Sequence, residues 1–77
     1  MARSLDVNGW TLVISSRHVT DEAPTSFWRG VVHVVPQRGG APRYTTESYA
    51  LHRTQEEAER VVEGLGTDWA WANAAVA

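Results

Sequence analysis

The stretch TQEEAERVVEGLGTDWA, residues 54–70, decides how the rest of the chain folds. Thr54 and Glu57 have the spacing of a capping box, in which the threonine side chain accepts a hydrogen bond from the amide three residues later. Apolar residues then recur at about 100° per residue, the pattern of a helix with one buried face. They are Ala58, Val61, Val62, Leu65, Trp69 and Ala72. We predict a helix over about residues 55–72.

Two glycines, Gly64 and Gly66, interrupt this stripe, and each weakens a helix interior by roughly 1 kcal/mol relative to alanine. A break near Leu65 is the alternative to one continuous helix. We favour continuity because Trp69 and Ala72 stay in phase across both glycines. Gly66 borders the apolar stripe, where a missing side chain lets a helix approach a sheet closely.

Upstream of this helix, three segments alternate or are rich in β-forming residues, as strands are. Proline and small polar residues at Thr20–Ser26 predict a loop between the first two. The expected strands cover about residues 9–19, 27–36 and 43–52. Short connections favour neighbouring antiparallel strands. We therefore predict one α+β domain over residues 1–77, with a three-stranded antiparallel β-meander and one C-terminal α-helix packed on one face.

Strand alternation divides the sheet residues between two faces. The face under the helix is predicted to carry Trp10, Leu12, Ile14, Trp28, Gly30, Val32, Val34, Tyr49 and Leu51. The opposite face is predicted to carry Thr11, Val13, Ser15, Arg17, Arg29, Val31, His33, Val35, Tyr44, Thr46, Ser48 and His52.

The run GVVHVV, residues 30–35, is apolar on both faces, and such strands are usually buried on both sides. One helix covers one face, so Val13, Val31 and Val35 are a candidate interface with a second copy. Scattered surface valines are the alternative, and they are common in soluble proteins. Trp71 lies away from the helix stripe, either as a further interface anchor or as a residue of a frayed end.

The composition supports self-association. Apolar residues make up 43% of the 77 residues and charged residues 21%, as in folded proteins. A core this small rarely offsets the cost of ordering the chain without disulfides, a metal or a partner subunit. The sequence contains no cysteine, which excludes disulfides. We therefore expect a homodimer. We expect no membrane partner, because no segment reaches the ~20 apolar residues of a membrane span.

Arg17, Arg29, His33, Tyr44 and His52 on the open face suggest an alternative function, nucleic-acid binding. Sheets of this kind can enter the major groove or stack on single strands. The net charge of −2 argues against it, because nucleic-acid binders usually carry a strong basic excess. We therefore place protein–protein interaction first.

No residue set predicts catalysis. The three histidines His18, His33 and His52 lack the i, i+4 spacing of a helical zinc motif, so they are interpreted as solvated surface residues. The chain contains neither a nucleophile elbow nor a phosphate-binding loop. We predict no enzyme activity, no catalytic residue, no metal and no cofactor. Without a signal-like apolar stretch, the expected location is the cytoplasm.

The tryptophan-led first strand at Trp10, FWRG at residues 27–30, and a helix that opens TQEEAE and carries Trp69 form a recognisable pattern. This pattern resembles a group of small uncharacterised bacterial β-β-β-α proteins. The resemblance covers most of the chain and implies a fold without an assigned activity. Together with the residues above, it predicts a small cytoplasmic interaction module that self-associates.

Overall fold

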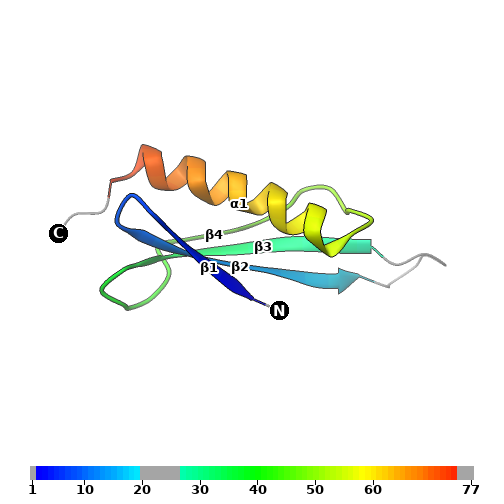
Figure 1. The fold of residues 1–77 in the computed structure, drawn as a ribbon, viewed down its shortest axis with the longest axis horizontal. Helices are drawn as coiled ribbons and strands as arrows, with labels where there is room; N and C mark the ends of the chain where they lie inside the picture. The colour runs from blue at the N-terminus through cyan, green and yellow to red at the C-terminus, as the bar shows by residue number, and fades with distance from the viewer. Residues whose placement is uncertain (1, 20–26, 75–77) are drawn as a thin grey trace.

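The computed structural model describes residues 2–19 and 27–74. They form a four-stranded antiparallel sheet, ordered β1-β2-β3-β4, with one helix laid across it (Figure 1). The elements are β1 Arg3–Val7, β2 Trp10–Val19, β3 Phe27–Pro36, β4 Tyr44–Glu47 and α1 Gln55–Ala72. The predicted α+β class and C-terminal helix are confirmed, whereas the prediction of three strands was wrong. The loop predicted at Thr20–Ser26 lies outside the described residues.

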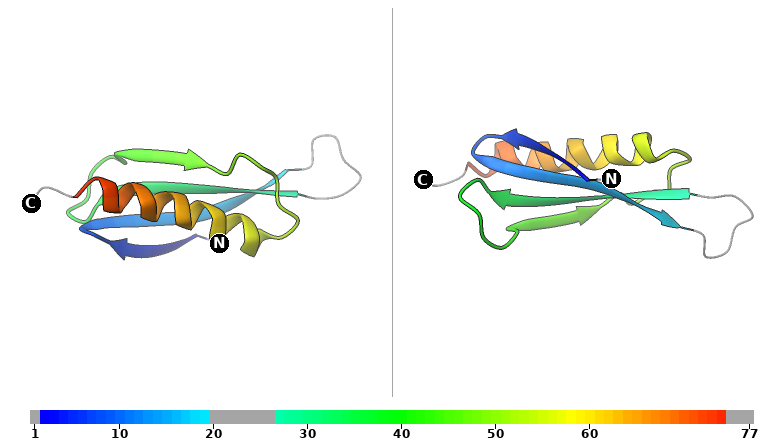
Figure 2. Two further views of the ribbon diagram at one scale, coloured as in Figure 1. Left: turned by 90° about the horizontal axis from the view of Figure 1, so that it is seen from above. Right: turned by 60° about the horizontal axis from the view of Figure 1, so that its bottom comes forward.

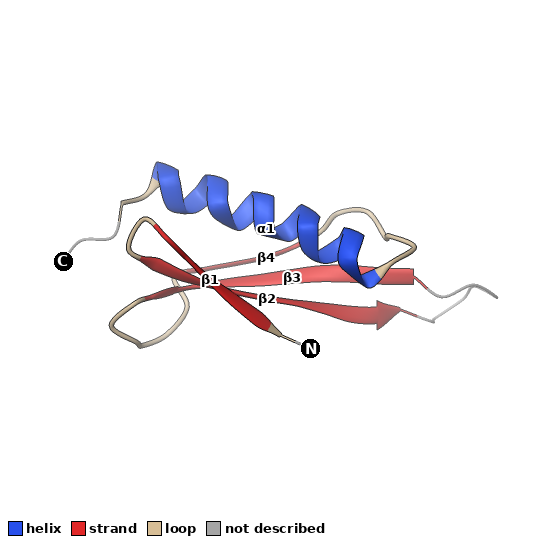
Figure 3. Cartoon of the chain, in the orientation of Figure 1, coloured by secondary structure: helices blue, strands red, loops and turns tan. Residues whose placement is uncertain are grey.

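The additional strand, β1, forms the edge of the sheet next to β2 (Figure 3). A two-residue turn connects the strands, with Asn8 at φ 50° and Gly9 at φ 86°. Positive φ at both central positions matches the right-handed twist of a hairpin, and asparagine followed by glycine tolerates it best. Val7 consequently pairs with Trp10, and Arg3 pairs with Ile14.

The third predicted strand was too long, because regular pairing ends at Glu47 rather than at residue 52. The next residue, Ser48, is buried and locked to Gly30: its amide donates to the Gly30 carbonyl at 2.9 Å, and its Oγ accepts from the Gly30 amide at 2.9 Å. The chain then leaves the sheet and returns for one bridge between His52 and Trp28. The regular pairing of β4 with β3 thus ends at a buried serine that is hydrogen-bonded to Gly30.

Helix α1 has the predicted bounds and is continuous through both glycines. Thr54 caps it, its side chain accepting from the Glu57 amide at 3.1 Å. A Cβ placed on Gly66 would lie 3.0 Å from side-chain atoms of both Leu12 and Val32. The predicted close approach of helix and sheet at Gly66 is therefore confirmed.

The core lies between α1 and the centre of the sheet. Its buried members are Trp10, Leu12, Ile14, Val32, Val34, Val62 and Ala70. Trp69 closes one end, stacked on Tyr44 with ring centroids 5.1 Å apart and edge-on to Trp10 at 5.0 Å. The assignment of Trp69 to the core is confirmed.

Several predicted core positions were wrong. Tyr49, Leu51 and Val61 are 90%, 40% and 38% exposed, and Ala72 is exposed too. The register pairs Tyr44 with Val34 and Thr46 with Val32, so these β4 residues share the helix-covered face. The predicted parity of the third strand was therefore inverted, because Tyr49 and Leu51 follow the point where strand pairing ends.

Candidate functional site

The sheet face turned away from α1, here called the open face, has no covering layer among the described elements. Figure 2 shows α1 on one side of the sheet, and no helix or strand within residues 2–19 and 27–74 covers the other side. Alternation and register define its central residues. They are Thr11, Val13, Ser15, Arg17, Arg29, Val31, His33, Val35, Thr45 and Glu47.

Three valines form the apolar part of the open face. Val13 pairs with His33, and Val31 and Val35 stand on either side of His33 along β3. All three are half-buried by neighbours within the sheet. The structure thus brings the predicted interface residues Val13, Val31 and Val35 together on one surface.

Trp71, the fourth predicted interface residue, does not join them. It is 66% exposed and belongs to α1, on the opposite side of the sheet from the open face. A flat contact over the three valines leaves Trp71 outside, so it belongs to a separate surface.

The charged residues of the open face lie toward its two ends. Arg17 and Arg29 are direct cross-strand partners at one end. An Nη of Arg17 lies 2.9 Å from a carboxylate oxygen of Glu47, and an Nη of Arg29 donates to the Ser48 carbonyl at 2.8 Å. Asp6 lies toward the other end of the face and accepts from the Thr11 hydroxyl at 2.9 Å. Among the described residues, two arginines and two acids therefore leave the face without net formal charge.

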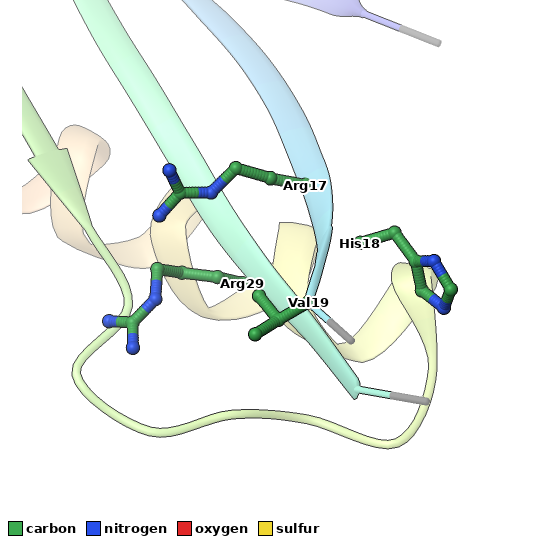
Figure 4. Close-up of a pocket in the computed structure, with 4 residues that line it drawn as sticks. All are labelled: Arg17, His18, Val19 and Arg29. Atoms are coloured by element: carbon green, nitrogen blue, oxygen red, sulfur yellow. The ribbon is translucent and has the colours of Figure 1, made fainter. Parts of the chain in front are cut away.

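A cavity of about 230 Å³ adjoins the arginine pair and is lined by Arg17, His18, Val19 and Arg29 (Figure 4). The two guanidinium groups extend in the same general direction, and His18 points elsewhere. The His18 ring packs against Trp28, with ring centroids 4.8 Å apart. Sequence reasoning had placed both arginines on one face but not identified them as direct neighbours, because the register of β2 and β3 was unknown.

Two residues predicted for nucleic-acid contact lie elsewhere. Tyr44 lies under α1 against Trp69, and the side chain of His52 is 12% exposed with its Nδ1 3.2 Å from a Glu57 carboxylate oxygen. Only Arg17, Arg29 and His33 remain on the open face. The prediction that Tyr44 and His52 belong there was wrong, since it followed from the inverted parity of the third strand.

The three histidines occupy separate environments. His33 Nδ1 lies 2.9 Å from the Thr45 hydroxyl, whereas His52 contacts Glu57 and His18 contacts Trp28. In the part of the chain that the structure describes, no three histidine or acidic side chains gather where they could hold a metal ion.

An ion-pair network that the sequence did not reveal ties β1 to α1. Glu59 is only 9% exposed, accepts from the Ser16 hydroxyl at 2.8 Å and lies 3.7 Å from Arg3 Nε. A hydrogen bond to Glu63 is the largest cause that raises the pKa of Arg3 above its usual range, although burial opposes it. Arginine is always charged in proteins, and the Arg3 guanidinium compensates the buried Glu59 carboxylate.

Comparisons of the chain with protein-family models, curated proteins and solved structures found no match. The resemblance to small bacterial β-β-β-α proteins accordingly stays a prediction. Among the described residues, no helix is long and apolar enough to cross a membrane.

Proposed function

We propose that this protein is a small interaction module that self-associates as a dimer through its open face. The observation that carries the proposal is the gathering of Val13, Val31 and Val35 on that face. In β3, the outward residues Val31 and Val35 alternate with Val32 and Val34, which are fully buried under α1. A strand that is apolar on both sides is typical of a sheet covered on both sides, and α1 covers one.

Charge favours a second copy as the occupant. The two arginines, Glu47 and Asp6 cancel, so two open faces meet without net repulsion. Nucleic acid would instead favour a face with a marked positive excess, because counterion release supplies much of its binding free energy. The loss of Tyr44 and His52 from this face weakens that alternative further.

Symmetry also favours a closed dimer. A flat face that meets its own copy across a two-fold axis is isologous, so the contact uses the same residues twice and ends at two subunits. Two sheets packed in this way lie about 10 Å apart, and their inner side chains form a shared apolar layer. Val13, Val31 and Val35 would become core residues of the dimer, which compensates for the small core of each subunit.

Sedimentation velocity at micromolar concentration tests the proposal. Wild-type protein is expected to sediment with a mass near twice the 8.5 kDa of the chain. Val31→Arg places a charge among the three valines and is expected to yield monomers. The matched control is Val61→Arg, which changes a 38% exposed valine on α1 and is expected to leave the dimer intact.

A wild-type protein that sediments as a folded monomer would contradict the proposal. Dissociation by Val61→Arg but not by Val31→Arg would also contradict it, since the contact would then involve α1. Thermal unfolding of each variant separates loss of the dimer from loss of the fold.

A further inference from the structure

The arginine pair, Arg17 and Arg29, is an unusual feature of this sheet. Like charges directly opposite each other on neighbouring strands destabilise a sheet. Among the described residues, the two arginines have one acidic partner, Glu47, which lies 2.9 Å from Arg17, while Arg29 contacts a backbone carbonyl. Within residues 2–19 and 27–74, the site therefore combines two positive charges with one negative charge, and these residues compensate the pair only in part.

The N–H donors of Arg17 and Arg29 also leave capacity for a further partner. A guanidinium carries five N–H donors in a fixed planar fork that matches the oxygens of carboxylates and phosphates. Among the described residues, Arg17 uses one nitrogen toward Glu47, and Arg29 uses one toward Ser48. Both groups extend from the same sheet face beside the cavity in Figure 4.

The size of the cavity limits what it can hold. Pockets that bury drug-sized ligands occupy roughly 300–1,000 Å³, whereas this one measures about 230 Å³. It is lined by residues Arg17, His18, Val19 and Arg29, and the His18 ring points away from the two arginines. A small ligand rich in acceptor oxygens fits this lining better than an apolar one, because hydrogen bonds between charged partners are the strong ones.

We propose that Arg17 and Arg29 form a binding site for a small tetrahedral oxyanion of the phosphate class, either inorganic phosphate or a simple phosphate monoester. The anion lies between the two guanidinium forks and relieves their mutual repulsion. Glu47 competes with it for Arg17, so Glu47 limits the affinity of the site. Both arginines belong to one subunit and lie at one end of the open face, so the site borders the proposed dimer contact over Val13, Val31 and Val35.

Titration of ¹⁵N-labelled full-length protein with inorganic phosphate, followed through the arginine Nε–Hε signals, tests the site. Chloride at matched ionic strength is the reference. Arg17→Gln and Arg29→Gln are each expected to weaken phosphate binding at least about tenfold, since each removes one charged donor group. Arg60→Gln is the control, because Arg60 is an exposed arginine with one glutamate partner at 2.9 Å, as Arg17 is. It is expected to leave the affinity unchanged.

Glu47→Gln supplies a test in the opposite direction. Removing the competing carboxylate is expected to strengthen phosphate binding about threefold to tenfold. Glu56→Gln, which removes the partner of Arg60, is expected to have no effect. The Arg17 side chain is 62% exposed, so Arg17→Gln is expected to fold. It therefore still tests the site if Arg29→Gln unfolds the protein.

Three results would overturn the proposal. The first is binding of both inorganic phosphate and a phosphate monoester that is no stronger than chloride binding. The second is equal loss of affinity in Arg60→Gln. The third is binding of a short single-stranded oligonucleotide without binding of phosphate or a phosphate monoester, which would mean that the surface reads a polymer. If the arginine signals shift with a phosphate monoester but not with inorganic phosphate, the result would still support the site and would identify the monoester as the ligand.

Discussion

Gly30 of β3 lies directly beneath Ala58 of α1: a Cβ placed on Gly30 would come within 2.2 Å of the Ala58 carbonyl oxygen. The first turn of the helix therefore rests on bare strand backbone. This contact sets the height of α1 above the sheet, and it leaves room for Val62, which is fully buried.

Gly30→Ala is expected to destabilise the protein by roughly 3 kcal/mol, because the added methyl group meets rigid backbone rather than a flexible side chain. Chemical denaturation at one fixed protein concentration measures the loss and keeps any dimer contribution constant. A free energy of unfolding within about 0.5 kcal/mol of wild type would show that α1 does not sit this close to β3.

Gly64→Ala is expected to have the opposite effect. Gly64 is an exposed helix residue, and a Cβ placed there would meet nothing within 4 Å. Alanine in an open helix position stabilises by about 1 kcal/mol relative to glycine. The same denaturation experiment checks it. Destabilisation here would argue against a helix that is continuous through residue 64.

Substitutions of the two tryptophans near the end of α1 are expected to have very different effects on the free energy of unfolding. Trp69→Ala removes the contacts with Trp10 and Tyr44 and is expected to cost about 3 kcal/mol. Trp71→Ala changes a residue that is 66% exposed and is expected to change stability by less than about 0.5 kcal/mol. Equal costs in thermal or chemical unfolding would show that Trp71 also packs against the protein or a partner.

The helix was predictable because its signals are local. Thr54 and Glu57 have the spacing of a cap, and the spacing of Val62, Leu65 and Trp69 indicates one buried face whatever the rest of the chain does. The missed strand β1 also had a local signal. Asn8 followed by Gly9 is typical of a two-residue hairpin turn, but RSLDV before it lacks the apolar alternation by which strands were recognised.

The register of the strands had no comparable local signal. Tyr44 and Tyr49 have opposite parity in the sequence, and either one could face the helix. Their positions follow from Ser48, whose paired hydrogen bonds to Gly30 end β4. Such a long-range contact depends on the folded sheet. The same limit hid the direct pairing of Arg17 with Arg29, which depends on the register between β2 and β3.

The most direct test of the account is an isotope-filtered NOE experiment on a mixture of ¹³C-labelled and unlabelled protein, which detects contacts between copies only. We expect intermolecular contacts from the methyl groups of Val13, Val31 and Val35. Contacts confined to α1, for example from Val61 or Trp71, or the absence of any intermolecular contact at millimolar concentration, would contradict self-association through the open face.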